Sequence, residues 1–210
     1  MKPFFLSYYI NENTPSYGGE RNVFRIEKLT SIDNGDRTNN TKLHFNSHLG
    51  THIDFPLHFF KEGKSINDYD ASYWVFKNIA ILECQTNEIE NHLDEIDNNV
   101  EILILKTNFH KFRGKEIYWR DQPIISSTLP LILKKRFPYL RVFGFDLISL
   151  TSKLNREEGR LAHLNFLSEP EILIIEDMDL RQLNVRPTKI IISPLMISGV
   201  EGVPCTIIAY

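Results

Sequence analysis

Short apolar runs alternate along the chain with amphipathic or polar connections. Six runs are rich in Ile and Val, as is typical of buried strands, and they span residues 78–84, 101–107, 140–146, 171–177, 189–193 and 205–210. Two of the connections, residues 126–137 and 156–168, have the spacing of helices. Strands that alternate with helices predict an α/β domain.

The two predicted helices differ in their signals. Ser126 or Ser127 is expected to cap the first one. In the second, Leu161, Leu164 and Leu167 are expected to form one apolar stripe, although a glycine at position 159 is unfavourable inside a helix.

The first sixty residues have no helical pattern. Residues 4–10, 22–30 and 41–47 are predicted strands, and residues 16–20 and 33–36 have the composition of turns. A length of 210 residues suits one core, and no linker, charge block or repeat divides the chain. We therefore expect a single domain over residues 1–210, with a mixed sheet and flanking helices.

Composition excludes several classes of partner. The chain is 42% hydrophobic and 24% charged, and its net charge of -3 gives no reason to expect nucleic acid. It has no apolar run of membrane-spanning length, and its first residues do not resemble a signal peptide. Cys84 and Cys205 lie far apart beside apolar runs, which favours free thiols and a cytoplasmic location.

Residues 44–58, "HFNSHLGTHIDFPLH", contain four of the seven histidines and one aspartate. Imidazoles beside a carboxylate are typical of a divalent metal site. A solvated strand face is the alternative, but solvated faces elsewhere in this chain consist of Lys, Glu and Asn. The isolated His44, His92 and His110 are interpreted as surface or hydrogen-bonded residues.

The spacing of this segment requires a bend. On a straight strand, His48 and Asp54 would lie roughly 20 Å apart, too far to hold one ion. A helix would bring His48 and His52 together, but Pro56 disfavours it. Gly50 can adopt the tight turn that folds His48 back toward His52 and Asp54.

The run HLGTHIDFPLH fits the pattern HxGTHxDxPxH of the cyclase family of metal-dependent hydrolases, which includes bacterial kynurenine formamidase and isatin hydrolase. Further segments resemble that family along nearly the whole chain, namely residues 5–19, 60–68, 102–108, 143–150 and 194–210. The resemblance implies the swivelling β/α/β type of fold for this α/β domain.

The resemblance also implies a site. His48, His52 and Asp54 match metal ligands, and His58 matches the catalytic acid or base. His163 and Glu176 match a second pair of ligands, with a spacing one residue longer than expected. Zinc is the first expectation and manganese the second, with one or two ions per chain.

The implied activity is hydrolysis of a small aromatic amide, as in an arylformamidase acting on N-formylkynurenine, by a homodimer or homotetramer. Three alternatives remain open. A cyclase or dehydratase would use the same metal ligands for another reaction. Two histidines and a carboxylate also make the facial triad of non-haem iron oxygenases, although the α/β pattern disfavours it. A non-catalytic binding protein could retain the fold.

Some positions depart from the family pattern. Thr151 stands where an acid is expected, Asp177 follows Glu176 where the family has asparagine, and Lys106–Asn108 replace an Arg-Thr-Gly stretch. The arginine expected shortly after Pro204 is absent. These changes lie on the expected substrate side and leave the substrate open. Phe59, Phe60 and Tyr17 are interpreted as core aromatics.

Overall fold

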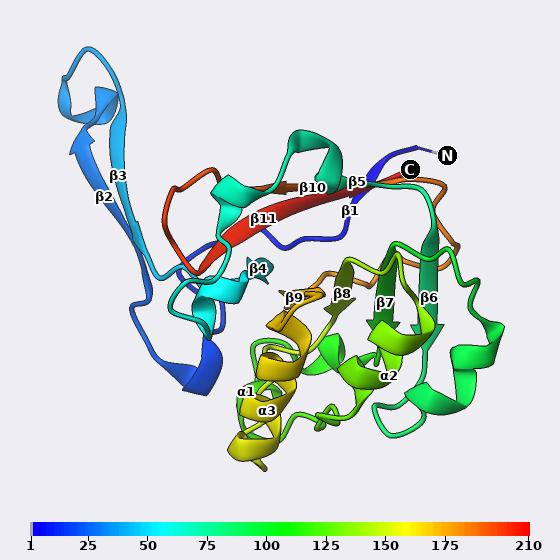
Figure 1. The fold of residues 1–210 in the computed structure, drawn as a ribbon. Helices are drawn as coiled ribbons and strands as arrows, with labels where there is room; N and C mark the ends of the chain where they lie inside the picture. Colours follow the sequence, from blue (N-terminus) through cyan, green and yellow to red (C-terminus); the bar gives the residue numbers. More distant parts are fainter. Residues whose placement is uncertain (1) are drawn as a thin grey trace.

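A computed structural model describes residues 2–210 and contains one large mixed sheet (Figure 1). The strand order is β5-β10-β11-β4-β9-β8-β7-β6, and β1 pairs with β11. These strands are β1 (Phe4–Phe5), β4 (His52–Asp54), β5 (Val75–Phe76), β6 (Ile79–Glu83), β7 (Ile102–Lys106), β8 (Val142–Phe145), β9 (Leu173–Glu176), β10 (Ile190–Pro194) and β11 (Gly202–Ala209). The predicted α/β class and mixed sheet are confirmed.

The sheet has a parallel half and an antiparallel half. Strands β6, β7, β8 and β9 are parallel, whereas β4, β10 and β11 pair antiparallel with their neighbours. All five residues of β7 are buried, and the apolar run of the first four predicts this burial. The short strand β4 lies where the two halves meet, between β9 and β11. Side chains on β4 and β9 are therefore neighbours.

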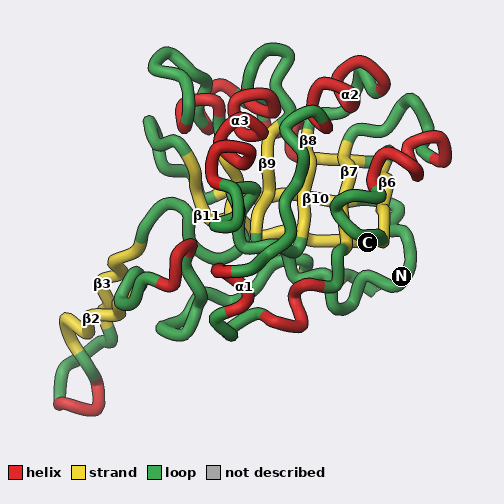
Figure 2. Tube along the Cα trace, turned by 90° about the horizontal axis from the view of Figure 1, so that it is seen from below, coloured by secondary structure: helices red, strands yellow, loops and turns green. Residues whose placement is uncertain are grey.

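The helices are α1 (Ile117–Arg120), α2 (Leu129–Arg136) and α3 (Arg156–Leu167). Helices α2 and α3 lie together on one face of the parallel strands (Figures 1 and 2). The predicted N-cap of α2, Ser126 or Ser127, is wrong, because the helix begins after Thr128. The backbone N–H of Ser127 instead donates to Oε1 of Glu158 at 2.7 Å. The spacing of apolar residues in the sequence did not predict the four-residue helix α1.

The buried stripe of α3 also differs from the prediction. Leu161 is 47% exposed, and the buried face of the helix consists of Gly159, Ala162, His163, Phe166 and Leu167. Gly159 is required by close approach, since a Cβ there would lie 2.4 Å from the Cα of Thr151. The polar His163 therefore lies on the buried face of α3, which the spacing predicted to consist of leucines.

A two-stranded hairpin projects from the body of the molecule (Figures 1 and 2). It consists of β2 (Phe24–Thr30) and β3 (Asn40–Phe45). Ile26 pairs with Leu43 on one face of the hairpin. On the other face His44 pairs with Arg25, and Nε2 of His44 lies 2.8 Å from Oε2 of Glu27. Residues 4–10, predicted as one strand, form a strand only at Phe4–Phe5.

The oligomeric state, a homodimer or homotetramer, stays a prediction.

Two smaller predictions concern the thiols and the membrane. Cys84 and Cys205 are both free, as predicted, and Cys205 is buried. Within residues 2–210, no helix has the length and apolar character needed to cross a membrane.

Candidate metal centre

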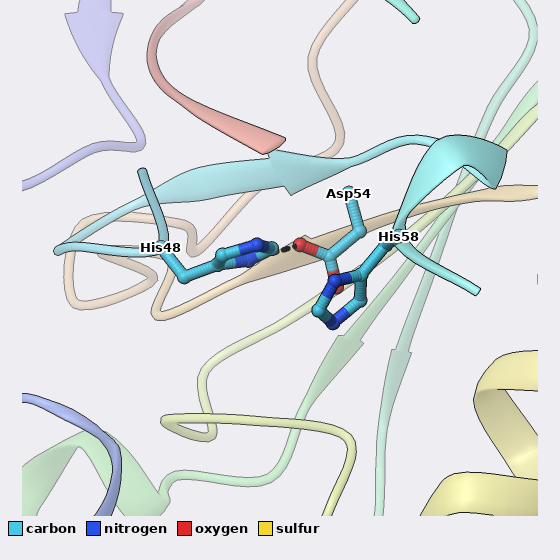
Figure 3. A group of neighbouring side chains, drawn as sticks. All are labelled: His48, Asp54 and His58. Carbon is cyan, nitrogen blue, oxygen red and sulfur yellow. Dashed lines mark ion pairs between the residues drawn. The ribbon is translucent and has the colours of Figure 1, made fainter. Parts of the chain in front are cut away.

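The chain bends at Gly50, as the spacing of the histidine segment predicts. Gly50 has a φ of +65°, in the left-handed region that favours glycine. Strand β3 ends at Phe45 and β4 begins at His52, so the intervening residues turn back toward the sheet. The turn places Nδ1 of His48 2.8 Å from Oδ1 of Asp54 (Figure 3).

Neighbouring strands bring a second carboxylate to the site. His52 on β4 is paired in register with Glu176 at the end of β9. Nε2 of His52 lies 3.4 Å from Oδ1 of Asp54 and 3.4 Å from Oε2 of Glu176. All three side chains are buried. Two ionisable carboxylates are therefore buried close together, with an imidazole between them.

Helix α3 adds the fourth member of this cluster. Nε2 of His163 lies 3.5 Å from Oδ2 of Asp54 and 3.5 Å from Oε1 of Glu176. The spacing of thirteen residues between His163 and Glu176 leaves their side chains in contact, across the connection from α3 to β9. The structure thus brings together His48, His52, Asp54, His163 and Glu176, the residues predicted as ligands.

Backbone carbonyls set the orientation of two imidazoles. Nδ1 of His52 donates to the Gly50 carbonyl oxygen, and Nδ1 of His163 donates to the Gly159 carbonyl oxygen, both at 2.8 Å. A carbonyl oxygen only accepts, so the proton must sit on Nδ1 in each ring. Each Nε2 then faces the carboxylates, which is the arrangement of a histidine prepared for a metal.

Charge in the cluster is tightly coupled. Burial alone would lower the pKa of His163, but hydrogen bonds and charge from Asp54 and Glu176 outweigh it and raise that pKa to about 10. The close carboxylates of Asp54 and Glu176 likewise outweigh burial and raise the pKa of His52 well above its usual value. Burial would raise the pKa of Asp54, but the histidines that lie against its carboxylate hold it well below its usual value. The carboxylates are thus ionised and attract positive charge.

The donor set fits a divalent cation. Within residues 2–210, the buried atoms Nε2 of His52 and Oδ1 of Asp54 have no hydrogen-bond partner, which is unusual for buried polar atoms. The donor atoms of His52, Asp54 and Glu176 lie within 4.8 Å of one another, and so do those of His48, Asp54 and His58. Imidazole nitrogens and carboxylate oxygens in this arrangement suit zinc or manganese.

His58 stands at the edge of the cluster, on a 3-10 turn that follows β4 (Pro56–His58). Its ring centroid lies 4.4 Å from that of His48, and the two rings flank the Asp54 carboxylate (Figure 3). Burial lowers the pKa of His58, and the charge of Asp54 offsets this only in part. A neutral imidazole at this position can accept a proton.

Several residues that support the site were not assigned from the sequence. The backbone N–H of Leu150 donates to Oε1 of Glu176 at 2.5 Å, and the Ser149 hydroxyl donates to the same oxygen at 3.2 Å. Oε1 of Glu201 lies 3.3 Å from Nε2 of His48 and accepts from the Ser47 hydroxyl at 2.7 Å. Ser149 and Glu201 lie in two of the segments that resemble the family, residues 143–150 and 194–210. The sequence therefore offered a reason to place both residues near the site.

Two residues that depart from the family pattern have a left-handed backbone conformation. Asp177 has a φ of +50° and Asn108 a φ of +61°. Asp and Asn tolerate the left-handed region, so these residues can occupy the places of the family's Asn and Gly. Thr151 lies beside the site, with its hydroxyl 3.3 Å from Nδ1 of His163.

The metal-binding candidates line a cavity of about 220 Å³. Its walls include Tyr17, Phe59, Ile148 and Thr151. Phe59 stacks on the His163 ring, with centroids 5.0 Å apart and planes 19° apart. The cavity therefore combines a polar floor with largely apolar walls, as ligand sites commonly do.

The chain is similar in sequence to known proteins. Over 206 residues the chain is 29% identical to the kynurenine formamidase of Bacillus mycoides, covering 95% of this chain and 92% of the relative. A second relative, an uncharacterized protein of Haemophilus influenzae, is 32% identical over 107 residues, covering 47% of this chain and 75% of the relative.

Solved structures share the fold. Isatin hydrolase A from Labrenzia aggregata, bound to benzyl benzoate, superposes with a TM-score of 0.79 at 17% identity, covering 99% of this chain and 93% of that one. A potential metal-dependent hydrolase with cyclase activity gives a TM-score of 0.74 at 20% identity, covering 99% and 96%. The sequence model of the family described as "Putative cyclase" matches residues 4–151, and the chain belongs to that family.

Proposed function

We propose that this protein is a metal-dependent hydrolase that cleaves the amide bond of a small aromatic amide, with an aryl formamide as the first candidate substrate. The observation that carries the proposal is the buried cluster of His52, Asp54, His163 and Glu176 at the floor of a small cavity, with His58 at its edge. The similarity to kynurenine formamidase over nearly the whole chain supports the choice of substrate.

The residues that would hold the metal are His48, His52, Asp54, His163 and Glu176. Asp54 belongs to both groups of close donor atoms, so it would help to hold the metal whether one ion or two bind. A divalent cation supplies Lewis acidity, which polarises a carbonyl group and makes water a better nucleophile near neutral pH. Zinc is the first candidate and manganese the second.

His58 is the proposed acid and base. Its imidazole is largely neutral at pH 7, because burial lowers its pKa. It takes a proton from the attacking water as the new carbon–oxygen bond forms at the amide carbonyl carbon. It returns that proton to the amide nitrogen as the carbon–nitrogen bond breaks, which for a formamide releases formate and an amine.

The size of the cavity limits the substrate. A volume of about 220 Å³ lies below the range of sites for drug-sized ligands, which favours a small molecule. Phe59 and Ile148 offer apolar surface for an aromatic ring beside the polar floor. This arrangement supports an aryl amide over a peptide or a polymer.

Elemental analysis of the purified protein, combined with a formate-release assay on formanilide and N-formylkynurenine, tests the proposal. We expect about one or two divalent ions per chain, loss of formate release after chelation, and recovery on adding zinc or manganese. His52→Ala should remove both bound metal and turnover. His92→Ala, at a half-buried histidine paired with Glu95, is the matched control.

Two outcomes would contradict the proposal. Metal retained at full stoichiometry by His52→Ala would refute the assignment of that ligand. A metal-loaded protein that releases no amine or carboxylate from any amide, but dehydrates or cyclises a substrate, would assign the site to that other reaction.

A further inference from the structure

A fully buried glutamine, Gln122, lies in the segment between α1 and α2. Its Nε2 donates to the carbonyl oxygens of Ser149 at 2.6 Å and Thr151 at 3.0 Å. Its Oε1 accepts from the backbone N–H of Ile148 at 3.1 Å and that of Ser149 at 3.4 Å. Both hydrogens and the oxygen of this side-chain amide therefore bind the backbone of one loop, residues 148–151.

Few side chains other than glutamine satisfy these partners. A carbonyl oxygen only accepts and a backbone N–H only donates, so the neighbours fix the orientation of the amide. A glutamate would place an oxygen that cannot donate against the two carbonyl oxygens. A methionine would leave the buried backbone groups without their partner, which is costly. The Ser152 hydroxyl also donates to the Gln122 carbonyl oxygen at 2.8 Å, so the main chain of Gln122 binds the same loop.

The loop 148–151 also binds the candidate ligand Glu176. Oε1 of Glu176 accepts from the backbone N–H of Leu150 at 2.5 Å and from the Ser149 hydroxyl at 3.2 Å. Oε2 of the same carboxylate lies 3.4 Å from Nε2 of His52. The loop therefore sets the rotation of the Glu176 carboxylate, and with it the oxygen that faces the other candidate ligands.

We infer that Gln122 is a positioning residue for the metal centre, which holds residues 148–151 in place and thereby orients the carboxylate of Glu176. This inference rests on the part of the proposed function that makes Glu176 a ligand. Groups that orient a ligand commonly change metal affinity as strongly as a weak ligand does. Ile148 and Thr151 also line the cavity, so the same hydrogen bonds shape the wall that a substrate meets.

Zinc affinity of Gln122→Met, measured by competition with a chromophoric chelator, tests the inference. Methionine has a similar length but cannot donate to the two carbonyl oxygens. We expect the affinity to fall roughly tenfold or more. The visible absorption of the cobalt-loaded protein should also change, because a rotated carboxylate alters the coordination of the ion. Gln122→Glu keeps the acceptor and loses both donors, so it should weaken zinc binding in the same direction if Gln122→Met does not fold.

A general loss of stability is separated by a core variant. Leu93 is buried in the 3-10 helix Ile89–Glu95, which follows β6 at the edge of the sheet. Leu93→Ala should lower the thermal midpoint by several degrees through the cavity it creates. Its zinc affinity should stay within about threefold of the native value, because it leaves the loop 148–151 unchanged. An equal loss of zinc affinity in Leu93→Ala and Gln122→Met would overturn the inference.

A double variant tests the route through Glu176. If Gln122 acts by orienting this carboxylate, Gln122→Met should change zinc affinity by less than about twofold when Glu176→Ala is already present. The same loss in both backgrounds would show that Gln122 acts elsewhere and would overturn the inference.

A failure of the proposed function gives a different result. If the native protein binds zinc but hydrolyses no amide, the proposed reaction is wrong, while zinc affinity and cobalt absorption still test Gln122. Native affinity and an unchanged cobalt spectrum in Gln122→Met would overturn this inference alone.

Discussion

The guanidinium of Arg113 pairs with both carboxylate oxygens of Asp177, the residue that directly follows Glu176. Nε of Arg113 lies 2.9 Å from Oδ1, and Nη2 lies 2.8 Å from Oδ2. The Tyr118 hydroxyl donates to Oδ1 at 2.6 Å. Asp177 is buried and its φ is +50°, so these contacts hold an unusual backbone conformation next to a candidate ligand.

Removing Arg113 should therefore destabilise the fold. Arg113→Met leaves the buried Asp177 carboxylate without its cation, which should lower the free energy of unfolding by about 3 kcal/mol. Adding Asp177→Asn should restore most of this loss, because asparagine is neutral and tolerates the same φ. Urea unfolding of the single and double variants measures both effects. Equal stability of the two variants would show that the unpaired charge is not the cause.

Gly50→Ala should weaken metal binding. A residue with a Cβ at a φ of +65° costs about 1–2 kcal/mol, and the new Cβ would lie 3.2 Å from Cγ1 of Ile10. The turn that aligns His48 with Asp54 should shift, and zinc affinity should fall roughly tenfold or more. Gly35→Ala is the control, since its φ is +89° with no atom within 4 Å of the added Cβ. Unchanged affinity in Gly50→Ala would contradict the role of the bend.

His58→Gln should separate proton transfer from metal binding. Loss of a general acid and base should lower kcat about 10²- to 10⁴-fold. Metal content should stay at the native level, because the candidate ligands His48, His52, Asp54, His163 and Glu176 are unchanged. Elemental analysis beside a formate-release assay makes the comparison. Loss of the metal would instead assign His58 as a ligand.

Metal binding should release protons. Asp54 and Glu176 raise the pKa of His163 to about 10 and that of His52 well above its usual value, so both rings are protonated at pH 7 without a metal. A metal at each Nε2 displaces one proton, so about two protons should leave. Affinity should accordingly fall as pH is lowered.

Titration calorimetry in buffers with different ionisation enthalpies counts these protons. His163→Ala should release about one proton fewer than the native protein. Binding without proton release would show that neither imidazole takes part.

Much of the sheet could be predicted because its strands are buried on both faces and read as continuous apolar runs, as in β7 and β8. The bend at Gly50 could be predicted because His48 and Asp54 cannot share an ion along a straight strand. These features depend on local sequence and simple distance. The boundaries of the short strand β4 depend instead on its neighbours β9 and β11.

Other features depend on contacts that are remote in sequence. The inward position of His163 depends on carboxylates from β4 and β9. The spacing of the leucines in α3 therefore predicted the wrong buried face. The hydrogen bonds between Gln122 and residues 148–151 join two segments that meet only in the folded chain. Arg113 could not be matched to Asp177 from the sequence, because their side chains meet only after β9 is in place.

Asp54 and His163 lie more than one hundred residues apart in the chain, yet their side chains face the same point in the folded protein. An ion held by both would act as a reversible cross-link between strand β4 and helix α3. Cross-links that close such long loops restrict the unfolded chain strongly. The supply of metal would then govern how long each folded molecule persists, as well as how fast it works.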